Sequence, residues 1–553
     1  MYQYNEQDRT QLKTRSLIFQ RQIERNLAGK ISDEKFRPLR LQQGLYYQRQ
    51  SPMLRVAVPY GMLASKQLRT LAKVARNFDE GYCHITTRQN IQFNWVNLQA
   101  MPEILATLAE ADLHSIQTSG NCIRNITSDP FAGVAQDEII DPRPYCEIIR
   151  QWSLGHPEFA YLPRKFKIAI SGSKEDRAIT QAHDIGLRVK VDKERGIGFQ
   201  VIVGGGLGRT PVIGSTLELF VPEQDILDYL TAILRVYNQH GRRDNKYKSR
   251  IKILVKSIGI TQFKHQIDQT LVQVRVYSQL LHAQHVSAIN KHFPKPCYRQ
   301  FETQELSQIN RLSADKPAFD NWLNRNTQAH KVSDYRAVSL PLKNPSSAPG
   351  DVSAEQLDRI ADLADRYSFG EVRSTHQQNL VMADVAIIDL FDLWLALDKI
   401  GLAEPNIGTM HDIICCPGLT YCSLANTESI PIAQSIQKAY DDLDFVYDLG
   451  ELTLNISGCM NACSHHHLAN IGILGVDKKG QQFFQISLGG SKGNESKLGK
   501  ILGPSVSAAE VTNVIKKIIH IFRSLRLGSE NFIDTFTRVG LTIFKEGVYG
   551  HAN

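Results

Sequence analysis

The sequence repeats itself, and this repetition constrains the possible fold more than any other feature. Segment 67–78 matches segment 356–367, and both have the apolar spacing of an amphipathic helix. Further similar pairs follow in the same order at nearly constant separation: 86–91 with 375–380, 166–172 with 452–458, 184–186 with 470–472, and 199–205 with 484–490. Two copies are too few for a solenoid. We therefore predict two similar halves related by a pseudo-twofold axis, with a site between them.

Each predicted half begins with a strand–helix–strand unit and continues into a larger unit rich in strands. Residues 222–330 have a mostly helical pattern, and the polar stretch 303–329 is expected to connect the halves. The fold class predicted is α+β. The expected division is an N-terminal arm at 1–50, a small unit at 51–115, a large unit at 116–330, a second small unit at 331–405 and a second large unit at 406–553.

Composition resembles that of an ordinary globular protein. Of the 553 residues, 42% are hydrophobic and 22% are charged, no apolar run approaches the ~20 residues of a membrane span, and the N-terminus lacks the features of a signal peptide. Nine cysteines without the spacing of a disulfide scaffold indicate a reducing compartment, so a cytoplasmic location is expected. The net charge of +8 is spread along the chain without a nucleic-acid-binding motif. This favours small anionic ligands and an acidic protein partner.

Four cysteines in the C-terminal third form two close pairs, Cys416 with Cys422 and Cys459 with Cys463. This spacing suits four-cysteine ligation of a cubane iron–sulfur cluster. The second pair follows an apolar strand pattern that ends in small residues, where backbone can approach a bulky inorganic group. Two disulfides and a zinc site are the alternatives, although the chain does not look secreted and zinc prefers tighter pairs. Cys415 is a rival ligand to its neighbour Cys416.

The cysteine pairs match the Cys-x5-Cys and Gly-Cys-x3-Cys signature of the sulfite and nitrite reductases, which couple a 4Fe–4S cluster to sirohaem. The chain resembles this family over nearly its whole length, and most of all the bacterial assimilatory sulfite reductase haemoprotein (beta) subunit. Met460 and Asn470 depart from the family pattern, which usually has proline and an acidic residue there. The resemblance implies that the four cysteines ligate the cluster and that Cys463 also bridges to the sirohaem iron. It further implies an internally duplicated fold with ferredoxin-like half-domains and two larger domains that bind sirohaem and the cluster.

Basic motifs in the first half predict the wall of an anion pocket. Arg supplies a fixed fork of donors, Lys supplies a charge whose pKa can be lowered, and lysines two positions apart on a strand share one face. A single basic residue is usually a solvated surface charge, but each of these motifs adjoins an apolar strand. The family equivalents surround the substrate, so we predict the catalytic residues Arg88, Arg124, Lys165 and Lys167.

The resemblance also indicates which residues hold sirohaem, whose eight carboxylates demand many donors. The family equivalent of Arg164 helps to hold one of these carboxylates. Asn121 and Asn461 stand in the same motifs as the predicted site residues and, with Cys463, complete the predicted cofactor-binding set.

Three further segments contain residues of functional type, and each has more than one possible role. The basic segment 242–250 contains Arg242, Arg243, Lys246, Lys248 and Arg250, and is either a sirohaem contact or a solvated loop. The glycine-rich segment 204–208 lacks the spacing of a dinucleotide-binding motif and is expected to pack against the macrocycle. His465, His466 and His467 are expected near the cofactor or exposed, since consecutive histidines rarely converge on one ion.

The expected function is that of an assimilatory sulfite reductase, which reduces sulfite to sulfide with six electrons at sirohaem coupled to a 4Fe–4S cluster. A sirohaem-dependent nitrite reductase that makes ammonia is the alternative, and a non-enzymatic iron–sulfur electron carrier or redox sensor is a more distant one. The sequence contains neither a flavin-binding pattern nor a dinucleotide fingerprint. The expected partners are therefore sulfite, or else nitrite, and an acidic electron donor that is either a flavoprotein subunit or a ferredoxin, with no nucleic acid and no membrane.

Overall fold

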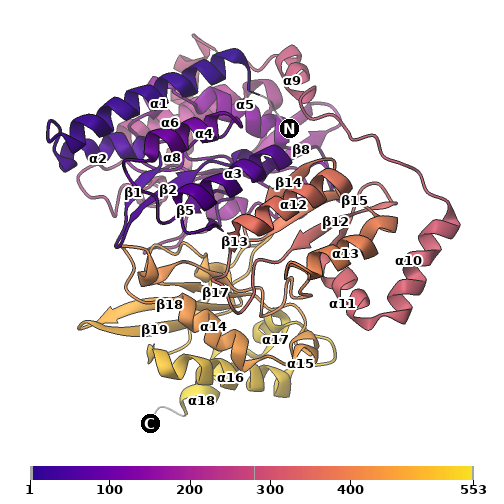
Figure 1. Ribbon diagram of the computed structural model, residues 1–553. Coiled ribbons are helices and arrows are strands. Elements are labelled where there is room, and N and C mark those ends of the chain that lie inside the picture. Colours follow the sequence, from indigo (N-terminus) through magenta and orange to yellow (C-terminus); the bar gives the residue numbers. More distant parts are fainter. Residues whose placement is uncertain (1–3, 279, 551–553) are drawn as a thin grey trace.

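Two small sheets, one in each half, are completed by strands from the opposite half. The computed structural model describes residues 4–278 and 280–550 (Figure 1). The first sheet has the order β1 (Leu45–Tyr47), β2 (Pro52–Val56), β5 (Ile91–Phe93), β4 (Tyr82–Ile85) and β13 (Asp351–Ser353). The second has the order β11 (Thr327–Ala329), β12 (Tyr335–Leu340), β15 (Leu380–Ala386), β14 (Glu371–Ser374) and β3 (Met62–Ala64). Because β13 pairs with β4 and β3 pairs with β14, the halves are interlocked by a reciprocal strand exchange.

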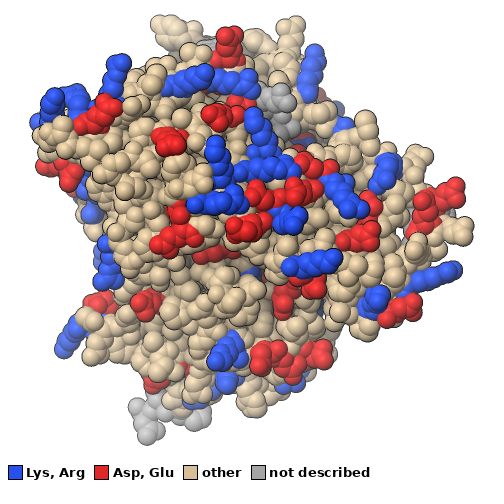
Figure 2. Space-filling model, in the orientation of Figure 1, with Lys and Arg blue, Asp and Glu red and all other residues tan. Residues whose placement is uncertain are grey.

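The two repeated helices lie side by side over these sheets. They are α3 (Ser65–Phe78) and α12 (Ala354–Tyr367), and their apolar faces join one continuous core. Their outer faces carry ion pairs between the helices, such as Arg69 with Asp362 at 2.8 Å. Figure 2 shows basic and acidic side chains alternating across this surface. Such exposed pairs contribute little individually, so the shared core holds the helices together.

A larger sheet in each half repeats the same local topology. The first has the order β10 (Ser215–Pro222), β9 (Gly196–Val203), β8 (Ile185–Asp192), β7 (Ile168–Ser171) and β6 (Thr127–Ser128). The second has the order β16 (Ile414–Cys415), β17 (Leu454–Ser457), β18 (Ile471–Lys478), β19 (Gln481–Leu488) and β20 (Lys500–Ile501), and β21 (Val506–Ser507) pairs with β19. In both sheets a parallel pair, β7 with β8 or β17 with β18, precedes an antiparallel hairpin. The predicted internal duplication and α+β class are thereby confirmed.

Helices pack on the large sheets, some directly and some through other helices. Those of the first half are α5 (Arg143–Ser153), α6 (Ile226–His240), α7 (Ile251–Ile258), α8 (Ile260–Arg275) and α9 (Ala283–Asn290). Those of the second are α14 (Ile430–Ala439), α15 (Leu443–Asp448), α16 (Ala508–Leu525), α17 (Phe532–Val539) and α18 (Leu541–Tyr549), grouped at the C-terminal end of the molecule (Figure 1). Across the described ranges, none of the helices combines the length and the apolar character that crossing a bilayer requires.

The N-terminal arm and the connection between the halves are both helical. In the arm, α1 (Glu6–Leu27) and α2 (Asp33–Gln42) pack against each other and α1 contacts α4 (Met101–Ala109). The connection continues the helical pattern of residues 222–330. It forms α10 (Thr303–Asp315) and α11 (Pro317–Asn326) before β11, because Phe319 and Trp322 of α11 are fully buried in the core shared with α13 (Leu390–Asp398).

Candidate functional site

Two equivalent loops, one from each half, interlock at the centre of the molecule. Gln89 and Gln378 occupy the same position in these loops, and both have left-handed backbone, with φ of 58° and 62°. Gln89 donates through Nε2 to the carbonyl of Ser374 at 3.0 Å, and Gln378 donates in the same way to Ile85 at 3.2 Å. The loop that carries Arg88 is therefore fixed by the opposite half.

Both predicted site arginines are held by neutral acceptors. Arg88 donates through Nη1 to Thr127 Oγ1 at 3.1 Å and through Nη2 to the Asn125 carbonyl at 2.6 Å. Arg124 donates to backbone carbonyls, including that of Gly120 at 2.8 Å from Nη2. Burial, followed by the positive charge of Arg124, lowers the pKa of Arg88 to about 9. These contacts orient the guanidinium groups without neutralising them.

The two predicted lysines lie beside these arginines. Lys165 and Lys167 flank the fully buried Phe166 in an extended segment that leads into β7, so regular strand begins just after them. Burial and the charge of Arg124 lower the pKa of Lys165 to about 7. Burial, Arg88 and Lys165 lower the pKa of Lys167 well below its ordinary range. An anion that enters this pocket would relieve the mutual repulsion that contributes to both shifts.

One buried carboxylate, Asp184, lies against the cationic cluster. It accepts from Arg250 Nε at 2.7 Å and from the backbone N–H of Lys167 at 2.9 Å. Asp184 precedes a strand in the first half, and Asn470 occupies the corresponding position in the second half. This difference between the two repeats is the sequence signal that could have pointed to Asp184. One carboxylate against so many cations leaves the pocket strongly positive.

The predicted sirohaem contacts divide into two groups. Arg164 donates to Asn121 Oδ1 at 3.2 Å, and burial and the charge of Arg124 lower the pKa of Arg164, which places this pair at the cationic pocket. Within the basic segment, Arg250 points inward to Asp184, whereas the exposed Arg242 pairs locally with an acidic neighbour. The segment is therefore partly a pocket wall and partly a solvated loop.

The second half brings the four predicted cysteines together at the same centre. The Cys416 sulfur accepts a hydrogen bond from the Gly458 backbone N–H at 3.1 Å. Burial, together with the neighbouring Cys463, raises the pKa of Cys459 to about 12. The pKa of Cys422 rises to about 11, mainly through burial, with further contributions from Cys463 and Cys416. The charge of Cys463 thus disfavours the ionisation of Cys459 and Cys422, and bound iron would relieve this by adding positive charge.

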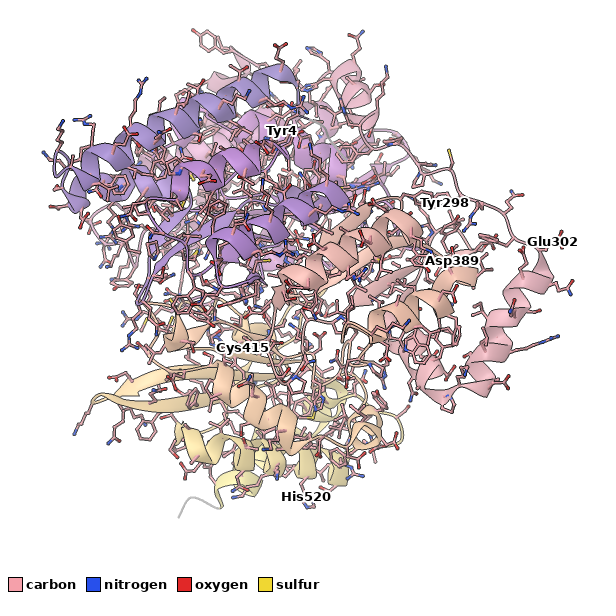
Figure 3. All side chains as sticks on the ribbon, viewed as in Figure 1. Tyr4, Tyr298, Glu302, Asp389, Cys415 and His520 are labelled. Atoms are coloured by element: carbon pink, nitrogen blue, oxygen red, sulfur yellow. The ribbon has the colours of Figure 1, made fainter. Side chains whose placement is uncertain are left out.

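Cys415 differs from this group. Its sulfur donates to the Cys416 carbonyl at 3.2 Å, and its backbone N–H donates to Gln378 Oε1 at 2.9 Å. Figure 3 places Cys415 where the C-terminal domain meets the half-domains. These contacts use Cys415 to anchor the loop, which agrees with Cys416 as the predicted ligand.

The local backbone and the donor set fit an iron–sulfur cluster. A Cβ atom on Gly418 would lie 2.6 Å from the Ser429 nitrogen, and one on Gly458 would lie 2.9 Å from the Gly418 Cα, so the two cysteine loops pack backbone to backbone. All nine cysteines are free. A cubane cluster binds one thiolate at each of its irons, so four cysteines on two closely packed loops suit it.

The cationic wall and the cysteine loops meet directly. Thr87, the residue before Arg88, donates through Oγ1 to the Cys463 carbonyl at 2.6 Å. In the next turn His465 and His466 are buried rather than exposed, while His467 Nε2 lies 3.2 Å from the Gly208 carbonyl. The glycine-rich segment therefore packs against the cysteine-bearing loop. A Cβ on Gly208 would come within 3.9 Å of the carbonyl of Asn461, which lies on this loop with its side chain exposed.

The second half repeats the scaffold of the pocket but not its charges. The backbone N–H of Thr453 donates to Asn470 Oδ1 at 2.9 Å, just as that of Lys167 donates to Asp184. Gln377 stands at the repeat position of Arg88. The predicted division of labour, with cations in the first half and cysteines in the second, therefore rests on one scaffold used twice.

Comparison with known proteins agrees with this geometry. The chain matches the family described as "Nitrite and sulphite reductase 4Fe-4S domain" over residues 119–274 and 408–552. It also matches the "Nitrite/Sulfite reductase ferredoxin-like half domain" over residues 46–111 and 330–400. The four matched segments together span most of the chain and follow its internal repeat.

Named relatives include both sulfite and nitrite reductases. The "Sulfite reductase [ferredoxin]" of Mycobacterium tuberculosis (strain ATCC 25618 / H37Rv) is 28% identical over 496 residues, which cover 87% of this chain and 81% of that protein. The "Assimilatory ferredoxin-dependent nitrite reductase" of Haloferax mediterranei is 29% identical over 513 residues, which cover 87% and 80%. The solved structure of the Mycobacterium tuberculosis NirA protein superposes with a TM-score of 0.79 at 26% identity and covers 97% of both chains.

These matches establish the fold with ferredoxin-like half-domains and the enzyme class. Sulfite and nitrite reductases match at similar identity, so the comparisons leave the substrate open between them. The likeness to a haemoprotein beta subunit stays a prediction. The family implies a 4Fe–4S cluster and sirohaem, in agreement with the thiols and the positive pocket described above. This chain belongs to the nitrite and sulfite reductase family of oxidoreductases.

Proposed function

We propose that this protein reduces sulfite to sulfide, with nitrite as a secondary substrate, and that Arg88, Arg124, Lys165 and Lys167 bind the oxyanion. The observation that carries the proposal is the excess of positive charge beside the cysteine loops, which Asp184 offsets only in part. The two arginines are held by carbonyl and hydroxyl oxygens, and none of the four cations forms an ion pair within the described residues. A pocket of this kind suits a small, highly charged anion.

The proposed cofactor sites follow from the donor sets. Cys416, Cys422, Cys459 and Cys463 would hold the 4Fe–4S cluster, and Cys463 would also serve the sirohaem iron. The sirohaem carboxylates and neighbouring polar groups would accept hydrogen bonds from Arg164, Arg250, Asn121 and Asn461. When bound, the two groups supply electrons and an iron centre for the central atom of the substrate.

The cationic residues have distinct proposed roles in the reaction. Conversion of sulfite to sulfide consumes six electrons and seven protons and releases three water molecules. The guanidinium groups of Arg88 and Arg124 orient the oxygens of the anion. Lys165, whose pKa is about 7, is suited to give a proton to a departing oxygen near neutral pH. A bound anion favours the protonated form of Lys167, which then opposes the negative charge that develops on those oxygens.

We expect sulfite to have the higher kcat/KM when both anions are assayed with one chemical reductant. The reason is that sulfite reaches a charge of two in neutral to basic solution, whereas nitrite carries one, so four cations stabilise sulfite more. Lys167→Gln should therefore lower the sulfite value more than the nitrite value. A clear preference for nitrite in the unaltered protein would assign it instead to nitrite reduction, the alternative function.

A ferredoxin is the proposed electron donor, because relatives of both kinds carry ferredoxin-linked names. An acidic flavoprotein is the alternative. The net charge of +8 supports an acidic partner, and the nine free cysteines support a cytoplasmic location.

Turnover with reduced ferredoxin should fall steeply as salt is raised, because screening weakens attraction between opposite charges. The measurement is the rate against salt concentration, with dithionite as the matched donor that needs no docking surface. An equal decline with both donors would contradict a charged docking step. Rapid oxidation of NADPH by the purified chain alone would contradict the need for any partner.

A further inference from the structure

His376 connects two separate segments of the first half from its position in the second. The side chain is 1% exposed. Its Nδ1 lies 3.1 Å from the Thr87 carbonyl, and its Nε2 lies 3.2 Å from the Ser128 carbonyl. The imidazole therefore fills the space between the Arg88 loop and strand β6.

The two segments that His376 bridges are those that hold Arg88. Thr87 precedes Arg88 along the chain, and Ser128 follows Thr127, whose hydroxyl receives the Arg88 Nη1 donor at 3.1 Å. The imidazole thus lies against the backbone at both ends of this hydrogen bond, donating to one carbonyl and packing against the other. A shift in either segment would carry the guanidinium group with it.

The fold itself does not require histidine at this position. Thr87 is the repeat counterpart of His376: it occupies the same position in the first loop and has a much smaller side chain. The two counterparts reach in opposite directions across the pseudo-twofold axis. Thr87 donates to the Cys463 carbonyl in the second half, whereas His376 contacts carbonyls in the first. The larger side chain thus lies on the side where the cations are.

The protonation state of His376 indicates how to replace it conservatively. Burial is the main cause that lowers its pKa to about 4, and the charges of Arg88 and Lys492 contribute. The ring is therefore neutral at neutral pH and donates to one of the two carbonyls. Glutamine is also neutral, has similar reach and offers amide N–H donors, whereas methionine fills similar space without any donor.

We propose that His376 is a positioning residue for oxyanion binding, which acts through Arg88 by holding Thr87 and Ser128 at a fixed separation. This inference rests on the proposed function, since it takes Arg88 as a ligand of the substrate. A hydrogen bond between a charged donor and an anion is worth roughly 10-fold or more in affinity. Loss of the imidazole is therefore expected to weaken oxyanion binding while the cofactors remain bound.

The test is a double-mutant cycle between His376 and Arg88 in the cofactor-loaded protein. The dissociation constant of sulfite is measured by optical titration for the unaltered protein, His376→Met, Arg88→Ala and the double variant. We expect His376→Met to weaken sulfite binding by roughly 10-fold, as when one charged hydrogen bond to the anion is lost, and to have no further effect once Arg88 is absent. His376→Gln should restore most of the affinity.

A matched control separates positioning from stability. His330 is likewise buried, with Nδ1 3.3 Å from the Val332 carbonyl and Nε2 3.2 Å from Asp384 Oδ1. His330→Met should lower the melting temperature without changing the sulfite dissociation constant. Sirohaem absorbance and iron content should stay unchanged in both histidine variants.

The outcomes distinguish this inference from the proposed function. Equal weakening by His376→Met with and without Arg88 would overturn the positioning role, as would a glutamine variant no better than methionine. If Arg88→Ala weakens sulfite binding and His376→Met does not, the inference fails alone. If Arg88→Ala has no effect on sulfite binding, the assignment of Arg88 in the proposed function fails.

Discussion

Replacement of Cys416 by serine will remove most of the iron from the purified protein, whereas replacement of the adjacent Cys415 by serine will not. The Cys416 sulfur receives the Gly458 N–H, in the manner of a cluster ligand, while the Cys415 sulfur is occupied with a backbone carbonyl. Mutation of a residue that hydrogen-bonds to a metal ligand can reduce activity by up to ~100-fold, and loss of the ligand itself should reduce turnover further. Iron and acid-labile sulfide analysis and the optical spectrum provide the measurement.

The Cys463→Ala variant extends this test to the second cofactor. Because Cys463 is the proposed link to the sirohaem iron, its loss should change the sirohaem spectrum as well as the iron content. Cys297→Ala is the control, since that thiol is exposed and free. A Cys463 variant with normal iron and an unaltered spectrum would refute the assignment, and iron loss in the Cys415 variant would favour the rival ligand.

Lys165→Ala and Lys167→Ala are each expected to reduce turnover of the oxyanion by roughly 100- to 1,000-fold. A preorganised donor aimed at developing charge typically contributes about 2.7–4 kcal/mol to lowering the barrier. Both lysines lie in the cationic pocket, where burial and neighbouring positive charge lower their pKa values. The measurement is steady-state turnover with sulfite under a chemical reductant.

The cofactors should remain bound in both lysine variants. Lys174→Ala is the matched control, because Lys174 is an exposed lysine of the same domain. Its turnover should equal that of the unaltered protein. If sirohaem is lost from either pocket variant, the lysine in question anchors the cofactor and does not act on the substrate.

Local motifs predicted the parts of the site that depend on short stretches of chain. The cysteine pairs, Arg88, Arg124 and the two lysines could be proposed because each lies in a compact motif beside an apolar strand, and the structure brings them to one centre. The amphipathic repeats at 67–78 and 356–367 likewise have a strong helical period, and both form helices.

Features that depend on distant partners were not predictable in this way. Strands β3 and β13 have three residues each, too few for a periodic pattern, and their partners lie in the opposite half. His376 received no role because its contacts, Thr87 and Ser128, come from remote segments. The burial of α11 was likewise not predictable, because the polar residues around Phe319 and Trp322 obscure this apolar pair.

The strand exchange between the small sheets has a consequence for biosynthesis. Strand β4 ends at Ile85, but its partner β13 begins only at Asp351. At typical rates of translation, an interval on the order of ten seconds or more separates the emergence of the two strands from the ribosome. The edge of β4 stays unpaired throughout this interval, and such an open edge invites association with other nascent chains. The nascent N-terminal half is therefore expected to need protection by chaperones until β13 has been synthesised.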